Sequence, residues 1–148
     1  KPYRITVSGR IKHFISAFGE HVIGKEVELA MIKACGTTKA EVVEFTVAPQ
    51  IDGGEGGLPY HEWFVEFAKE PTDMADFSKI IDEEMQSQNV YYKDLIEGNI
   101  LKPIVLCPLK KDGFIDYMKS IGKLGGQNKV PRLSNDRKIA DQLSKLKA

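Results

Sequence analysis

The sequence predicts an α+β domain of two layers, with helices packed mainly on one face of a largely antiparallel sheet. Its 148 residues fit one domain, and an apolar content of 42% is enough for one hydrophobic core. Strand-like segments, in which apolar residues alternate with polar ones, are interspersed with helical segments, in which they recur every three or four positions. No repeat or linker interrupts this order, so we expect residues 1–148 to form a single domain.

Strands are predicted where apolar and polar residues alternate. The expected strands are a hairpin of 3–7 and 11–15, a pair at 42–47 and 60–67, and a last strand at 101–109. Pro103 stands near the beginning of the last strand, which suits an entry or edge position because proline donates no ladder hydrogen bond. The glycine-rich residues 52–57 have no Gly-Lys-Ser/Thr ending, so we interpret them as a flexible connection rather than a phosphate-binding loop.

Helices are predicted where apolar residues recur at helical spacing between polar ones. The expected helices are 24–34, 74–86, 89–98, 113–121, and a last helix with Ile139, Leu143 and Leu146 on its apolar face. Gly36 and Gly122 are expected to end the first and the fourth of these helices. Asp73 is placed to start the second helix, and Ser134 or Asn135 to cap the last, because their side-chain oxygens can accept from free N–H groups.

Composition argues against several classes of function. Lys plus Arg equals Asp plus Glu at 21 each, so the basic excess typical of nucleic-acid-binding domains is missing. No apolar run approaches the length of a membrane span and the first residues lack a signal-peptide pattern, so we expect no membrane contact and a cytoplasmic location. Cys35 and Cys107 form no CxxC pair and the histidines are scattered, so we predict reduced cysteines and no metal site.

The stretch 122–132 combines flexibility, positive charge and a rigid end. Gly125 and Gly126 can adopt backbone angles closed to other residues, whereas Pro131 fixes its own φ. Amide and cationic side chains that suit carboxylate or phosphate oxygens lie beside this proline: Gln127, Asn128, Lys129 and Arg132. The alternative interpretation is a solvated connection, which is the commoner role of a glycine-rich loop with two basic residues.

Two separated stretches resemble core motifs of a known superfamily. Residues 9–12, 15–24 and 26–28 are similar to the eighth core motif of acyl-adenylate-forming enzymes, and residues 125–132 are similar to the tenth. Their order and spacing resemble the small C-terminal domain of that superfamily. Three shorter segments, 45–49, 60–63 and 127–132, resemble more closely the auxin-responsive, Gretchen Hagen family of acyl acid amido synthetases.

This resemblance implies a reaction in two steps. A carboxylic acid attacks the α-phosphate of ATP to give acyl-AMP and pyrophosphate, and an amino-acid amine then displaces AMP to form an amide. Lys129 matches the adenylation lysine of the superfamily, whose charge would stabilise the charge that develops between carboxylate and α-phosphate. ATP and Mg²⁺ are the implied cofactors, bound mainly by a large N-terminal domain.

Further roles follow from the same resemblance. Lys12 matches the hinge position, at which a change in backbone angles swings the C-terminal domain between two orientations; by itself it would read as a surface lysine of a strand. Residues that would face the nucleotide or the acyl-adenylate are Gln127, Asn128, Arg132, Gly19, Glu20 and His21.

The implied partner is a large N-terminal domain that lies outside this chain. We therefore expect residues 1–148 to be a mobile C-terminal lid domain, inactive by itself, in a monomeric protein. The pockets that choose the carboxylic acid and the amino acid would lie in the N-terminal domain. Two alternatives stay open: the lid of a phenylacetate-type acyl-CoA ligase, and a free-standing, non-catalytic α+β module for ligand binding or interaction.

Overall fold

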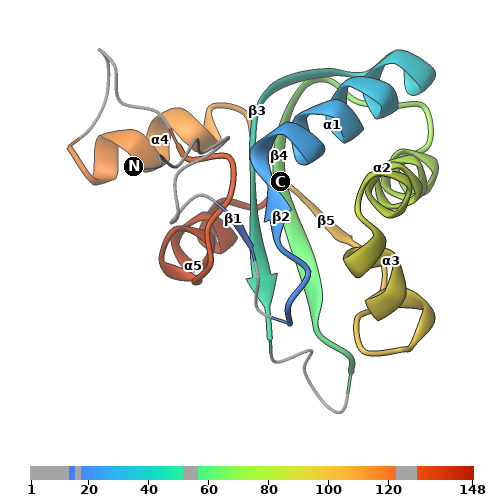
Figure 1. Ribbon diagram of the computed structural model, residues 1–148. Coiled ribbons are helices and arrows are strands. Elements are labelled where there is room, and N and C mark those ends of the chain that lie inside the picture. Colours follow the sequence, from blue (N-terminus) through green and yellow to red (C-terminus); the bar gives the residue numbers. More distant parts are fainter. Residues whose placement is uncertain (1–13, 16–17, 52–56, 123–129) are drawn as a thin grey trace, which may run out of the picture.

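The computed structural model describes residues 14–15, 18–51, 57–122 and 130–148 (Figure 1). Its centre is a sheet of three strands in the order β3–β4–β5. The strands are β3 (Glu41–Gln50), β4 (Tyr60–Lys69) and β5 (Val105–Pro108). The hairpin partners β3 and β4 are antiparallel, whereas β4 and β5 are parallel. The α+β class is confirmed, and the sheet is mixed rather than purely antiparallel because helices connect β4 to β5 and return the chain in the same direction.

Helices cover both faces of the sheet (Figure 1). The face with the longer helices carries α1 (Gly24–Thr38), α2 (Met74–Gln88) and α3 (Val90–Glu97). The opposite face carries α4 (Gly113–Ser120) and α5 (Lys138–Leu143), which continues into the 3-10 turn Ser144–Leu146. The larger part of the helical layer therefore does pack on one face, as predicted, and two shorter helices cover the other.

Two predicted helix ends were wrong. Helix α1 continues through Gly36 and ends before Lys39, which takes a left-handed φ of 61°. A glycine inside a helix costs only about 1 kcal/mol, and burial of Ala34 and Thr38 on either side of Gly36 outweighs that cost. Helix α5 begins after Arg137, not after Ser134 or Asn135, because the N–H of Ser134 donates to the carbonyl of Val47 in β3 at 3.0 Å.

Alternation along β3 and β4 divides the core in two. Phe45, Val47, Trp63 and Val65 belong to the cluster beneath α1 and α2. The intervening residues face α4 and α5, where Ala48 and Phe64 pack with the apolar sides of both helices. Both faces of the sheet are thus buried, which is why β4 reads as a continuous run of buried residues from 61 to 66.

The central strand β4 carries charged residues that are buried and paired. Glu62 accepts from the guanidinium of Arg137, at the start of α5, at 2.8 Å. Glu66 accepts from the N–H groups of Asp112 and Phe114, at 2.9 and 3.2 Å, and so caps α4. A carboxylate at a helix N-terminus accepts hydrogen bonds from the free N–H groups there and is attracted by the positive end of the helix dipole. These contacts attach both short helices to β4.

A second, two-stranded sheet precedes α1. β1 (Phe14–Ile15) pairs with β2 (Val22–Ile23) in antiparallel register. The predicted pairing of 3–7 with 11–15 lies mostly outside the described residues, as does the connection at 52–57. Strand β2 leads directly into α1 at Gly24, so residues 18–21, which precede β2, lie close to the N-terminus of that helix.

Candidate functional site

The candidate residues named above fall into two groups. Lys12, Gln127, Asn128 and Lys129 lie outside the described residues, so their roles stay predictions. Gly19, Glu20 and His21 form the turn before β2, and Arg132 lies in the segment that follows the stretch 123–129. The surroundings of these described residues define the candidate site.

The turn of residues 18–21 alternates in burial. Gly19 and His21 are exposed, whereas Glu20 between them is 0% exposed. Gly19 has φ 90° and His21 has φ 47°, so both lie in the left-handed region. A non-glycine residue in that region is strained, and such strain persists only where surrounding contacts hold it.

The carboxylate of Glu20 points into the domain and is fully used there. Its Oε2 accepts from Nε2 of His61 on β4 at 2.7 Å, and its Oε1 accepts from the N–H of Phe18 at 2.8 Å. Burial alone would raise the pKa of Glu20, but the hydrogen bond and charge of His61, with the N–H of Phe18, outweigh it and hold the pKa below its usual 4.5. Glu20 is therefore an anchor in this structure, and its predicted contact with an acyl-adenylate stays a prediction.

Lowering the pH should weaken this anchor. Because the pKa of Glu20 is lower in the folded state, its stabilisation is present above pH 4.5 and is lost as the pH falls through the folded pKa. We expect Glu20→Gln to lower the free energy of unfolding by about 1–3 kcal/mol at pH 7, since a charged hydrogen bond is replaced. Urea unfolding at a series of pH values should show the two proteins converging at acidic pH; a gap that stayed constant would contradict this account.

Asn89 joins the turn to two helices. Its Nδ2 donates to the carbonyl of Glu20 at 3.0 Å and to the Oε1 of Glu26 in α1 at 3.2 Å. Its Oδ1 accepts from the N–H of Tyr92 at 3.0 Å and so caps α3. The side chain is buried, and both of its polar ends are used. Asn89 thus fixes the backbone of the turn, while His61 fixes its side chain.

Tyr92 extends this polar network beneath α3. Its ring lies 5.3 Å from the ring of His61, and its hydroxyl donates to the Oδ1 of Asp82 in α2. The same Oδ1 accepts from the N–H of Ile104 at 3.1 Å. Burial, together with the nearby carboxylate of Asp82, raises the pKa of Tyr92 well above its usual value, so the phenol stays protonated and donates. Neighbouring Tyr91 is exposed, as expected for two residues that point in different directions along a helix.

Sequence reasoning missed His61 and Asn89 as parts of the site. A signal for His61 was present, since it shares the inward face of β4 with Trp63 and Val65, and an inward histidine needs a partner. No comparable signal identified Asn89. Its contacts to Glu20 and Glu26 span more than sixty residues of sequence.

Arg132 belongs to a segment that lies along the free edge of β3. The N–H of Val47 donates to the carbonyl of Arg132 at 2.9 Å, and Val47 forms a parallel bridge with Leu133. The guanidinium of Arg132 donates to the carbonyl of Phe45 at 2.6 Å and pairs with Glu44, whose Oε1 accepts from the N–H of Phe45. The Arg132–Glu44 pair therefore satisfies the N–H and the carbonyl of Phe45 on the edge of β3, two residues before Val47.

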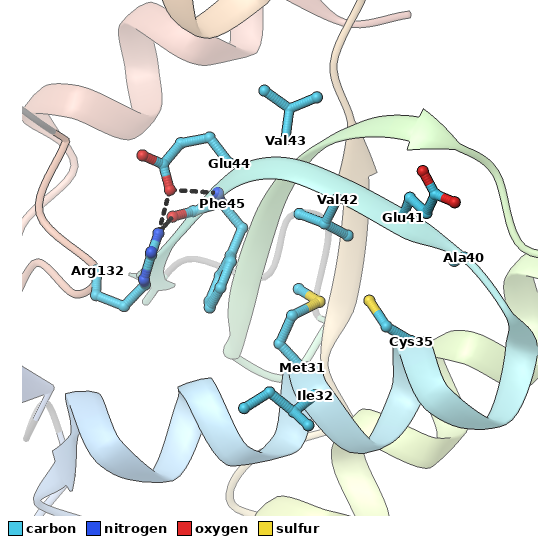
Figure 2. A pocket seen from close by; sticks show the side chains of 10 residues that line it. All are labelled: Met31, Ile32, Cys35, Ala40, Glu41, Val42, Val43, Glu44, Phe45 and Arg132. Carbon is cyan, nitrogen blue, oxygen red and sulfur yellow. Dashed lines mark hydrogen bonds and ion pairs between the residues drawn. The ribbon is translucent and has the colours of Figure 1, made fainter.

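Arg132 also borders a groove of about 470 Å³ between α1 and the first half of β3 (Figure 2). The apolar lining includes Met31, Val42 and Phe45, and the guanidinium lies 4.2 Å from the centre of the Phe45 ring. Its Nε also contacts the Oε2 of Glu28 in α1 at 3.2 Å. In this arrangement the carboxylates of Glu28 and Glu44 neutralise the cation of Arg132. Its predicted role in facing the nucleotide stays a prediction.

The pairing of Arg132 with Glu44 predicts energetic coupling. We expect the double variant Arg132→Ala/Glu44→Ala to be more stable than the sum of the single losses suggests, with a coupling of about 0.5–3 kcal/mol. The reason is that Arg132→Ala leaves the Glu44 carboxylate without its cation, whereas Glu44→Ala leaves Arg132 with Glu28 but without its nearer carboxylate. A double-mutant cycle of urea unfolding measures this, and Arg132→Ala/Asp76→Ala, which combines Arg132 with an exposed carboxylate on α2, is the control. Additive losses in the first cycle would contradict the pairing.

Neither a metal-ligating cluster nor a membrane-spanning helix is found among the residues that the structure describes. In the described ranges, no three His, Cys, Asp or Glu side chains are grouped so that they could hold a metal ion. Among the helices that the structure describes, none is both long enough and apolar enough to cross a membrane.

Comparison with known proteins places the chain in a family. The sequence model of the GH3 family C-terminal domain matches residues 25–138. No curated protein matches the sequence. Two solved structures are similar over 95% of this chain at 16% identity: a GH3.15 acyl acid amido synthetase, with a TM-score of 0.73, and AtGH3.15 acyl acid amido synthetase in complex with 2,4-DB, with a TM-score of 0.71. The chain spans 27% and 26% of their lengths.

The family match covers well over half of the chain, and it confirms the family that the motifs resemble: this chain belongs to the GH3 family and comprises its C-terminal domain.

Proposed function

We propose that this chain is the mobile C-terminal domain of an ATP-dependent acyl acid amido synthetase. The observation that carries the proposal is the family match over residues 25–138, together with a fold shared with two amido synthetases over 95% of the chain. The chain spans 27% and 26% of those two proteins. In this proposal its partner in catalysis is a large N-terminal domain. That domain holds the carboxylic acid, the amino acid and most of the ATP.

In the first step, a carboxylate oxygen attacks the α-phosphorus of ATP and pyrophosphate leaves. Lys129 stabilises the negative charge that develops between these groups. The anchored segment 130–134 supports this assignment, because a loop that must deliver a cation needs a fixed end. Mg²⁺ would neutralise the phosphates, and in this proposal it is bound mainly by the N-terminal domain.

In the second step, the amine of an amino acid attacks the acyl carbon and AMP leaves, so that an amide forms. Lys12 is the hinge that exchanges one orientation of the domain for the other between the steps. In the second orientation the turn of residues 18–21 faces the acyl-adenylate. Exposure of Gly19 and His21 in that turn is consistent with such a contact.

The proposal is tested with the complete protein. A panel of carboxylic acids is screened for acid-dependent exchange of pyrophosphate into ATP, which reports the first step alone. Acids that support exchange are then offered amino acids or coenzyme A, and the products are identified by mass spectrometry. Amides with amino acids support the proposal, and thioesters would assign the chain to an acyl-CoA ligase. The absence of exchange with every acid would favour a non-catalytic module.

A further inference from the structure

We infer that Glu20, His61 and Asn89 are positioning residues that hold the turn of residues 18–21 in one conformation for the amide-forming step. The inference rests on the proposed function, in which this turn faces the acyl-adenylate. None of the three side chains needs to touch the substrate. They act through the backbone of Gly19 and His21, the exposed residues of the turn.

The first support is that the polar groups of Glu20 are held from several elements. Its carboxylate is bound by His61 of β4 and by the N–H of Phe18, and its carbonyl accepts from Asn89. The carbonyl of His21 is also within 3.4 Å of the Asn89 amide. A turn held at the side chain and at consecutive carbonyls has little freedom to rearrange.

The second support is the cost of this arrangement. An ionisable pair buried as deeply as Glu20 and His61, at 0% and 2% exposure, loses much of its hydration, and an apolar pair of similar size would stabilise a core at least as well. Strain at His21, with its φ of 47°, adds to that cost. What the pair supplies beyond stability is a defined backbone path for the turn.

The third support is the location of the anchors. His61 sits on the central strand, and Asn89 caps α3 while its amide reaches Glu26 in the first turn of α1. Glu26 itself accepts from the N–H of Ile23 in β2 at 3.0 Å. Hydrogen bonds thus link the turn to the sheet through His61, and to α1 and α3 through Asn89. Any motion of the domain as a rigid body carries it without deformation.

The test compares two replacements of His61 in the complete protein. His61→Leu removes the donor and leaves the Glu20 carboxylate buried without its partner. His61→Gln keeps an N–H donor near the position of Nε2. The matched control is Val65→Ala, which removes a fully buried side chain from the same face of β4 and takes no part in the hydrogen bonds from His61 and Asn89 that hold the turn. Three rates are measured: pyrophosphate exchange, amide formation at saturating amino acid, and hydrogen–deuterium exchange of the peptide that contains residues 18–21.

We expect His61→Leu to lower amide formation by about 100-fold, as a misplaced contact near the reacting atoms can, while pyrophosphate exchange changes little. Deuterium uptake in the turn should rise in His61→Leu and return towards wild type in His61→Gln. Val65→Ala should affect both chemical steps alike. Unchanged uptake in His61→Leu, or an equal fall of both steps in His61→Leu and in the control, would overturn the inference. If the wild-type protein forms neither acyl-adenylate nor amide, the proposed function fails, and the deuterium uptake of the two His61 variants still decides whether His61 holds the turn.

Discussion

Lys129→Ala should lower acid-dependent pyrophosphate exchange by about 100- to 1,000-fold in the complete protein. The estimate follows from the loss of about 3–4 kcal/mol when one preorganised electrostatic contact to a developing charge is removed. Lys129→Arg keeps the charge but changes its geometry, so we expect an intermediate rate. The measurement is the initial rate of pyrophosphate exchange at saturating acid and ATP.

The control for this prediction is Lys123→Ala, which removes a lysine from the same stretch, 122–132, without altering the motif at 125–132. Its exchange rate should stay close to that of the wild type. Amide formation from acyl-adenylate prepared chemically should also survive in Lys129→Ala, because the charge assists only the first step. Equal losses in Lys123→Ala and Lys129→Ala, or an unimpaired Lys129→Ala protein, would contradict the assigned role.

Trp63→Ala should cause the largest loss of stability among the changes considered, about 3–5 kcal/mol in the free energy of unfolding. Trp63 is 1% exposed at the centre of β4, and its ring stacks on Phe45 with centroids 5.6 Å apart. The reason for the loss is a large cavity between the sheet and α1 that the surrounding side chains cannot fill. Urea unfolding followed by circular dichroism measures it.

The variant Trp63→Phe distinguishes the contribution of the aromatic ring of Trp63 from that of its indole nitrogen. The indole Nε1 of Trp63 is buried without an acceptor among the described residues, so phenylalanine loses no hydrogen bond and keeps an aromatic ring against Phe45. We expect Trp63→Phe to cost much less than Trp63→Ala. A loss as large in Trp63→Phe would contradict this expectation.

The candidate residues that bear on chemistry were named from short motifs, and the structure adds what surrounds them. Glu20 illustrates the difference. Its motif placed it with Gly19 and His21 in one group, yet its side chain is buried and bound by His61 while its neighbours are exposed. Arg132 is a second example, because the guanidinium that suits an oxyanion is engaged by Glu44 and Phe45. Residue type defines what a group can bind, but the fold decides which partner reaches it first.

Local patterns in the sequence were sufficient to predict the α+β class, the positions of the main helices and strands, and the family. Each of these depends on signals within short stretches: the period of the apolar pattern, and the segments 45–49, 60–63 and 127–132 that resemble the family. Long-range contacts decide that β5 joins β4 in parallel, that the segment 130–134 pairs with the edge of β3 rather than starting α5, and that His61 and Asn89 bind the turn before β2. These features arise from hydrogen bonds between residues far apart in the chain. Such bonds form only when packing of the core brings their partners together, and no local pattern encodes that distance.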